Sequence, residues 1–272
     1  MPIVWETSEF SVSAWEPQVV SVGEKGFMLS ASFAAPAMNV WQVFTAPIGL
    51  DGVVGAITLP NKSATQSQQM PAMAAGADGR LALAYSFSDS LEKAHLFYGA
   101  RPDESSAYST FVDPEPNKQT NAPALAYSKD GSTLYLAYFT QAANKMEVRL
   151  LRRGTDGQTS TITFTTGTGQ DISPALAIGD NGGVVLWYQA TGSYRADIYA
   201  QGFTDFGGVL AAYGTPQKLN DEPIAPYAPT VTHVGEGVYF TAWSVPVKNE
   251  ARKASSYSYW LKGRFFKMTP GW

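Results

Sequence analysis

Hydrophobic residues in this sequence come in short runs of strand length, separated by turns rich in Gly, Asp and Asn. No stretch keeps the i, i+3, i+4 spacing of an amphipathic helix, and 25 glycines and 17 prolines are spread along the chain. Runs of this length that hold β-branched, aromatic and small residues are typical of β-strands. The pattern therefore predicts an all-β protein.

The strand-length runs recur with a nearly constant period. Each of five segments has a run opened by a proline, at intervals of 54, 52, 51 and 55 residues, at Pro17, Pro71, Pro123, Pro174 and Pro229. Each opener leads to a turn with Gly and an acidic residue, then to a second run ending in an aromatic residue. A polar loop and a third alternating run follow, with a weak fourth run such as residues 159–164. Self-similarity at this period is the signature of a repeat architecture.

Four antiparallel strands in each of five units predict a five-bladed β-propeller that forms a single domain over residues 1–272. The expected blades are 13–60, 67–112, 119–165, 170–218 and 225–266. The last unit lacks a fourth run, whereas residues 3–12 precede the first unit. We expect this N-terminal strand to close the last blade, because that pairing removes an open sheet edge. A β-sandwich fits the strand lengths but does not require a constant period.

Composition narrows the chemistry. A net charge of −4 argues against a nucleic-acid partner, which needs a clustered basic surface. The absence of cysteine excludes disulfides and thiolate metal sites. His95 and His233 stand alone, so we expect no metal site and no cofactor. No run approaches 18 apolar residues, so no membrane span is expected, and the first ten residues do not resemble a signal peptide.

One face of a propeller collects the loops that enter the first strands and leave the second strands. Candidate ligand-binding residues from the entering loops are Trp15, Gln69, Asn121, Asp171 and Tyr227. The aromatics that end the second runs are Phe33, Tyr85, Tyr138, Tyr188 and Trp243. Aromatic rings stack on sugars while amides and carboxylates bond their hydroxyls, which favours a carbohydrate ligand. The alternative is that the recurring aromatics only pack neighbouring blades together.

Catalysis is disfavoured by the same pattern. Five-bladed propellers include glycosidases that resemble arabinanases and invertases, and such enzymes need carboxylates around the axis. The first runs after the prolines contain no Asp or Glu. Glu16, Asp171 and Asp221 at the rim leave a carboxylate pair open. The expectation is a chain that is not an enzyme and has no catalytic residues.

With its Pro-Ala openers, Asp-Gly turns and terminal aromatics, the chain resembles β-propeller repeat proteins of bacteria and phages, including the small propeller lectins. The segment SKDGSTL at 128–134 is also similar to the Asp-box of sialidases, but it is one residue short, ends in Leu and occurs once. We interpret that segment as a turn.

Two functions from different classes are compatible with the sequence. The first is a non-catalytic, lectin-like module that binds glycan on one propeller face. The alternative is an interaction component of a phage virion or similar particle that binds a protein surface, and a glycoside hydrolase is the third possibility. The compartment is left open.

Overall fold

The structure, a computed structural model, is all-β. It describes residues 14–35, 40–61, 63, 65–88, 94–109, 111–142, 145–165, 170–180, 182–192, 195–221, 227–248 and 257–268. Among these residues the strands form five separate antiparallel sheets of three or four strands, each built from consecutive segments of the chain. The helical element among them is a single 3-10 turn, η1 (Gly23–Lys25). The all-β prediction is confirmed.

Each sheet corresponds to one sequence repeat. Sheet 1 contains β1 (Ala14–Ser21), β2 (Phe27–Ala35) and β3 (Val40–Ile48). Sheet 2 contains β4 (Gln68–Ala75), β5 (Leu81–Ser88) and β6 (Ala94–Arg101). Sheet 3 contains β7 (Thr120–Tyr127), β8 (Thr133–Ala142), β9 (Lys145–Gly154) and β10 (Thr159–Phe164). Sheet 4 contains β11 (Gln170–Ile178), β12 (Gly182–Gly192), β13 (Arg195–Phe206) and β14 (Val209–Lys218). Sheet 5 contains β15 (Tyr227–Gly235), β16 (Val238–Lys248) and β17 (Tyr257–Lys267).

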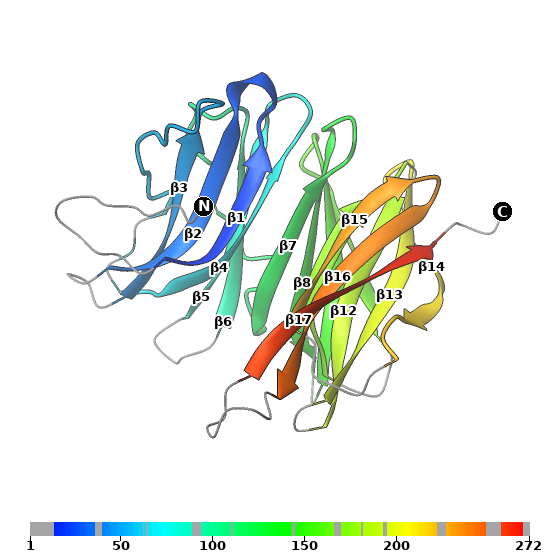
Figure 1. Cartoon of the computed structure of the whole chain (residues 1–272). Coiled ribbons are helices and arrows are strands. Elements are labelled where there is room, and N and C mark those ends of the chain that lie inside the picture. The colour runs from blue at the N-terminus through cyan, green and yellow to red at the C-terminus, as the bar shows by residue number, and fades with distance from the viewer. Residues whose placement is uncertain are drawn as a thin grey trace.

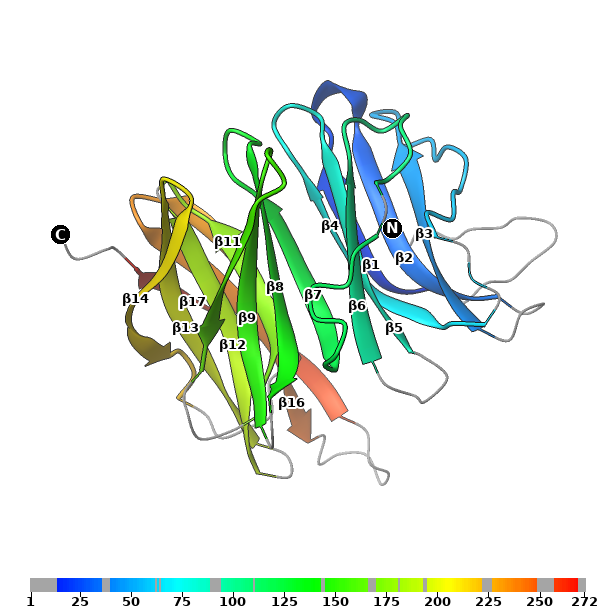
Figure 2. The ribbon, with the colours of Figure 1, turned by 180° about the vertical axis from the view of Figure 1, so that it is seen from behind.

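The first strands of the sheets lie next to one another. β1 packs beside β4, β4 beside β7, β7 beside β11, and β11 beside β15 (Figure 1). The reverse view shows the strands of sheets 2, 3 and 4 standing side by side (Figure 2). The first strand of each repeat is therefore the innermost one, and the later strands face outward.

The expectation of four strands in every repeat is met in sheets 3 and 4 and is wrong for sheets 1 and 2. There the fourth run is reduced to isolated bridges, such as Thr45 with Thr58 and Tyr98 with Val112. In the second repeat, Asp103 accepts hydrogen bonds from the backbone N–H groups of Ser105 and Ser106, which fold the chain into a local turn. Residues 3–12, the strand expected to complete sheet 5, lie outside the described residues.

Each repeated proline marks a β-bulge rather than the start of a strand. The pairing of each first strand with the second shifts register at its proline, and β1 already begins at Ala14, before Pro17. Proline has no N–H to donate to the ladder, so the ladder breaks there. The preceding residue has a left-handed backbone, with φ between 48° and 55°, at Glu16, Met70, Ala122 and Ser173. A non-glycine residue in this conformation costs about 1–2 kcal/mol, so the repeated bulge is a specific feature of the fold.

The hydrophobic core lies between the sheets. Four clusters of buried side chains each join two neighbouring sheets, from sheets 1 and 2 through to sheets 4 and 5. The alternating alanines of the first strands contribute to them, as Ala175 and Ala177 do between sheets 4 and 5. A fifth cluster on the other face of sheet 1 includes Leu29 and Phe44, and its described members come from the first repeat alone.

Candidate functional site

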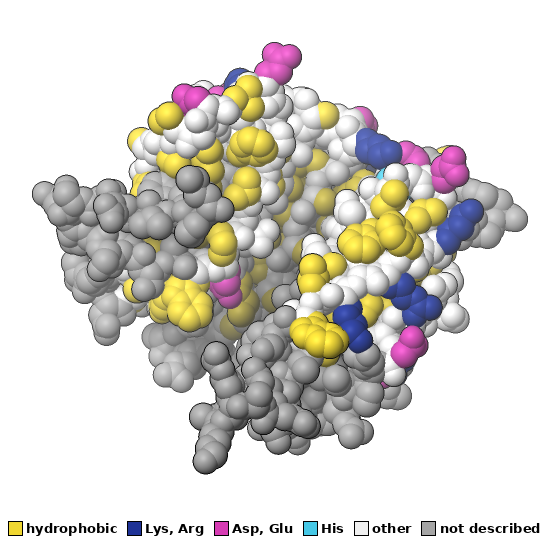
Figure 3. Space-filling view, viewed as in Figure 1, with side chains coloured by type: hydrophobic (Ala, Val, Ile, Leu, Met, Phe, Trp, Pro, Cys, Tyr) yellow, Lys and Arg dark blue, Asp and Glu magenta, His cyan; other side chains and the backbone are white. Residues whose placement is uncertain are grey.

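The five first strands converge on one pocket, here called the axial pocket. Its volume is about 430 Å³, and every first strand contributes lining residues. The left-handed residues before the prolines all line it, namely Glu16, Met70, Ala122 and Ser173. A space-filling view shows the molecule hollowed between β1 on one side and β15 on the other (Figure 3). The bulges therefore place one residue of each repeat at the mouth of a shared cavity.

Glu16 is the acidic residue of this pocket among the described residues that line it. Its side chain is exposed, and its Oε2 accepts a hydrogen bond from the backbone N–H of Met70 at 2.8 Å. That bond links the bulge of sheet 1 to the bulge of sheet 2. Across the pocket, the hydroxyls of Ser173 and Tyr188 are 3.3 Å apart. The pocket thus offers one carboxylate and one hydroxyl pair on a largely apolar lining.

The sequence placed Glu16 in an entering loop and so missed its position in the pocket. We counted the first strand from Pro17, whereas β1 begins three residues earlier. The carboxylate is on a first strand after all, one position before the stretch that lacked Asp and Glu. The signal that could have found it is the X-Pro pair itself, because proline restricts the residue before it. Asp89, Glu92, Glu222 and Glu250 lie outside the described residues.

The entering-loop candidates are placed differently from one another. Trp15 and Gln69 are exposed beside the axial pocket. Asn121 is half-buried, and its Oδ1 accepts the N–H of Ala122 at 2.8 Å. Asp171 is fully buried and accepts hydrogen bonds from Trp187 Nε1 at 3.1 Å and Thr165 Oγ1 at 2.9 Å. The side chain of Tyr227 lies outside the described residues.

The aromatics that end the second strands face the inter-sheet clusters. Tyr85 and Tyr138 are each 1% exposed, Trp243 is buried, and Phe33 and Tyr188 are half-buried. Burial raises the pKa of Tyr85 to about 12, although a hydrogen bond from Asn61 opposes the shift. Burial, and then the charge of Glu115, raise the pKa of Tyr138, whose hydroxyl donates to Glu115 Oε1 at 2.9 Å. These side chains hold neighbouring sheets together.

Asp221 lies apart from the axial pocket. It lines a cavity of about 440 Å³ beside sheet 5, together with Trp243, Lys262 and Arg264. Glu16 and Asp221 therefore do not form a carboxylate pair. Within the described part of the chain, no group of three or more His, Asp and Glu side chains is placed to hold a metal ion. The same residues contain no helix long and apolar enough to cross a membrane.

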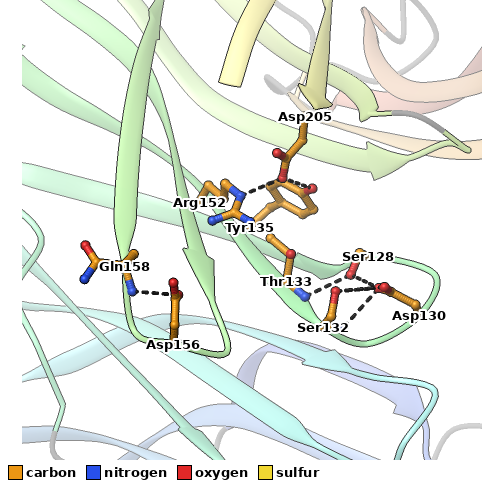
Figure 4. Close-up of polar contacts among 9 residues, drawn as sticks. All are labelled: Ser128, Asp130, Ser132, Thr133, Tyr135, Arg152, Asp156, Gln158 and Asp205. Atoms are coloured by element: carbon orange, nitrogen blue, oxygen red, sulfur yellow. Dashed lines mark hydrogen bonds and ion pairs between the residues drawn. The ribbon is translucent and has the colours of Figure 1, made fainter. Parts of the chain in front are cut away.

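The opposite ends of the first strands border a second cavity of about 520 Å³ with Lys129 and His233 in its lining. The segment SKDGSTL is the turn between β7 and β8 at this end. Asp130 there accepts hydrogen bonds from the hydroxyls of Ser128 and Ser132, which lower the pKa of its carboxyl to about 2 (Figure 4). The segment is a self-contained turn, as interpreted from the sequence.

No protein-family model matches the sequence, and no curated protein matches it. Solved structures do match. A protein of unknown function from Dyadobacter fermentans has a TM-score of 0.67 at 11% identity, covering 94% of this chain and 79% of that one. A thermostable family-43 glycoside hydrolase has a TM-score of 0.54 at 12% identity, covering 94% and 91%. A mutant sialidase of Trypanosoma rangeli with trans-sialidase activity has a TM-score of 0.59 at 12% identity, covering 92% and 46%.

The chain has a β-propeller fold, which it shares with these glycoside hydrolases and sialidases. Further matches are an α-L-arabinofuranosidase from Lactobacillus brevis and an exo-β-1,3-galactanase from Clostridium thermocellum. Most of the named neighbours are therefore carbohydrate-active enzymes. This finding contradicts the expectation of a non-catalytic, lectin-like module and the expectation that the chain is not an enzyme. The resemblance to propeller lectins and phage proteins finds no support among the matches, nor does assembly into a particle.

Proposed function

We propose that this chain is a carbohydrate-active enzyme of the glycoside-hydrolase type, with the axial pocket as its substrate site and Glu16 as its reacting carboxylate. The observation that carries the proposal is the position of Glu16, an exposed carboxylate at the mouth of the cavity shared by all five first strands. The hydrolases and sialidases among the structural neighbours support it, although their substrates are their own.

Glycosidases ordinarily flank the scissile bond with two carboxylates, one acting as acid and the other as base or nucleophile. Among the described residues the axial pocket supplies Glu16 alone. The second reacting group would then be a pocket water or a group of the substrate, as in substrate-assisted glycosidases. The exposure of Glu16 leaves its carboxylate accessible to substrate while the N–H of Met70 orients it.

The Glu16→Gln variant tests this assignment. We expect the parent to hydrolyse at least one member of a panel of aryl arabinosides, xylosides, galactosides and sialosides. Glu16→Gln should lower kcat/KM by about 10²- to 10⁴-fold, the range for loss of an acid–base group. The amide oxygen still accepts the N–H of Met70, so stability should be unchanged. Glu24→Gln in the exposed η1 turn is the matched control.

Azide added to Glu16→Ala provides a second readout. Recovered turnover with release of a glycosyl azide would identify Glu16 as the nucleophile, whereas recovery without that product would identify it as a base. A parent that hydrolyses none of the panel would contradict the proposed activity. Full activity of Glu16→Gln would remove Glu16 from the reaction.

We also propose that the five sheets are the five blades of one ring, with the bounds predicted from the sequence, and that residues 3–12 complete the fifth blade. Three large apolar side chains on the outer strand β17 support this pairing. Trp260 is 61% exposed, Leu261 is 80% exposed and Phe265 is 65% exposed among the described residues. A segment such as IVWETSEFSV at 3–12 has apolar residues to cover them.

Hydrogen exchange of the intact chain tests the closure. If residues 3–12 pair with β17, amides in both segments should share slow exchange, because each hydrogen-bonds the other. Peptic fragments covering 3–12 and 257–267 would be compared by mass spectrometry, with the outer strand β14 as the reference edge. Exchange of residues 3–12 within seconds would contradict the pairing.

A further inference from the structure

An exposed tryptophan stands directly beside the proposed reacting carboxylate. Trp15 precedes Glu16 in β1 and is 60% exposed, whereas Trp187 on a second strand is fully buried. Its ring meets the ring of Trp41 on β3 edge-on, with 6.2 Å between centroids and 88° between planes. A large indole left open to solvent on a regular strand has no packing role that explains its exposure.

The partner ring is held in place by the chain around it. The N–H of Trp41 donates to Ser67 Oγ at 3.2 Å, and the carbonyl of Trp41 accepts from Gln42 Nε2 at 2.9 Å. The same Gln42 amide nitrogen reaches the carbonyl of Gln66 at 3.4 Å, in the segment that enters sheet 2. The support beneath Trp15 is therefore fixed to both sheet 1 and sheet 2, so its own ring is a preorganised surface.

The neighbouring bulge of sheet 2 adds polar and soft apolar groups. Met70 is 38% exposed and is bonded through its N–H to Glu16, and Gln69 beside it is exposed. An indole face, a thioether, an amide and a carboxylate therefore lie along one edge. The C–H face of a sugar packs on an aromatic ring while an amide bonds its hydroxyls. A protein partner would instead need a broad apolar patch, and the described surface here is interrupted by Glu16 and Gln69.

We infer that Trp15 is the platform of an additional sugar subsite, so that the chain recognises oligosaccharides of at least two units rather than single sugars. This inference rests on the proposed function, because the first unit would occupy the axial pocket at Glu16. The stacked unit is held by contacts that do not change during the reaction. Trp15 is therefore a specificity-determining residue, and its loss should affect binding of longer substrates more than turnover.

Binding measured in the Glu16→Gln background tests the inference without hydrolysis. Arabino-, xylo- and galacto-oligosaccharides of one to six units would be titrated by calorimetry. We expect affinity to rise from one unit to two or three in at least one series, and Trp15→Ala to reduce that gain about tenfold, equivalent to about 1.4 kcal/mol. Trp15→Phe should keep part of the gain. Trp260→Ala, a tryptophan of equal exposure on β17, should keep all of it.

The outcomes separate the inference from the proposed function. If Trp15→Ala abolishes the gain but the parent hydrolyses nothing, the subsite holds and the enzyme proposal fails. If the parent is active and Trp15→Ala binds every length as the parent does, the subsite is refuted and the enzyme proposal holds. Equal affinity for all lengths in the starting protein, or no binding at all, would also overturn the subsite.

Discussion

Replacing Trp187 by alanine is expected to lower the free energy of unfolding by about 4 kcal/mol, the cost of a large cavity in a close-packed core. Trp187 is fully buried between sheets 3 and 4, with Phe164 and Tyr199 each 6.1 Å away between ring centroids. Urea denaturation followed by far-UV circular dichroism would measure the change. Trp260→Ala, on the surface, should change stability by less than about 0.5 kcal/mol.

The indole N–H of Trp187 extends the same prediction to Asp171. Because Asp171 is buried and accepts that N–H at 3.1 Å, Trp187→Phe and Asp171→Asn should each destabilise the fold. Their effects should be non-additive by about 1–2 kcal/mol, since both remove one interaction. Additive effects would contradict the hydrogen bond. An Asp171→Asn variant that keeps its stability but loses ligand affinity would restore Asp171 as a ligand-binding residue.

Replacing Gly182 by alanine is expected to destabilise the protein by about 3 kcal/mol through backbone strain and overpacking. Gly182 begins β12 with φ of +140°, a conformation that residues with a Cβ rarely adopt. An added Cβ would press on the carbonyl oxygen of Phe203 and lie 2.8 Å from the Cα of Thr204. Both contacts are backbone atoms of the paired strand β13, so neither can turn aside.

Gly207 provides the matched control for this substitution. It also has positive φ, at +59°, but nothing lies within 4 Å of where its Cβ would stand. Gly207→Ala should therefore cost only about 1 kcal/mol, the ordinary price of a left-handed alanine. Thermal and urea unfolding of both variants would be compared. Equal losses would mean that the close approach of β12 and β13 does not determine the effect.

The strand pattern and the repeat were predictable because both follow from local alternation and turn chemistry. The Asp-Gly turns behave as expected, since Asp78 and Asp130 accept nearby N–H groups and the glycines after them have positive φ. The missing fourth strands were not predictable. Alternation in a weak run does not show whether its ladder forms or stops after one bridge, as it does at Val112.

The candidate site was predicted only in part. Sequence reasoning nominated the face and included Trp15, which is exposed beside the pocket, but it treated Asp171 and Tyr138 as equivalent candidates although both are buried. Residue type and spacing do not report on burial, because polar side chains also satisfy buried donors between sheets. Glu16 was left as a rim residue, since a bulge changes which side a residue faces without changing the sequence pattern.

The repeated bulge also separates chemistry from architecture in this fold. Four residues with the same left-handed backbone, Glu16, Met70, Ala122 and Ser173, face one cavity, and they differ completely in side chain. Since the conformational cost belongs to the backbone at each position, exchanging one of these side chains alters what the cavity can do while leaving the sheets intact. The ring thus works as a set of interchangeable sockets, in which new reactivity can arise through single substitutions.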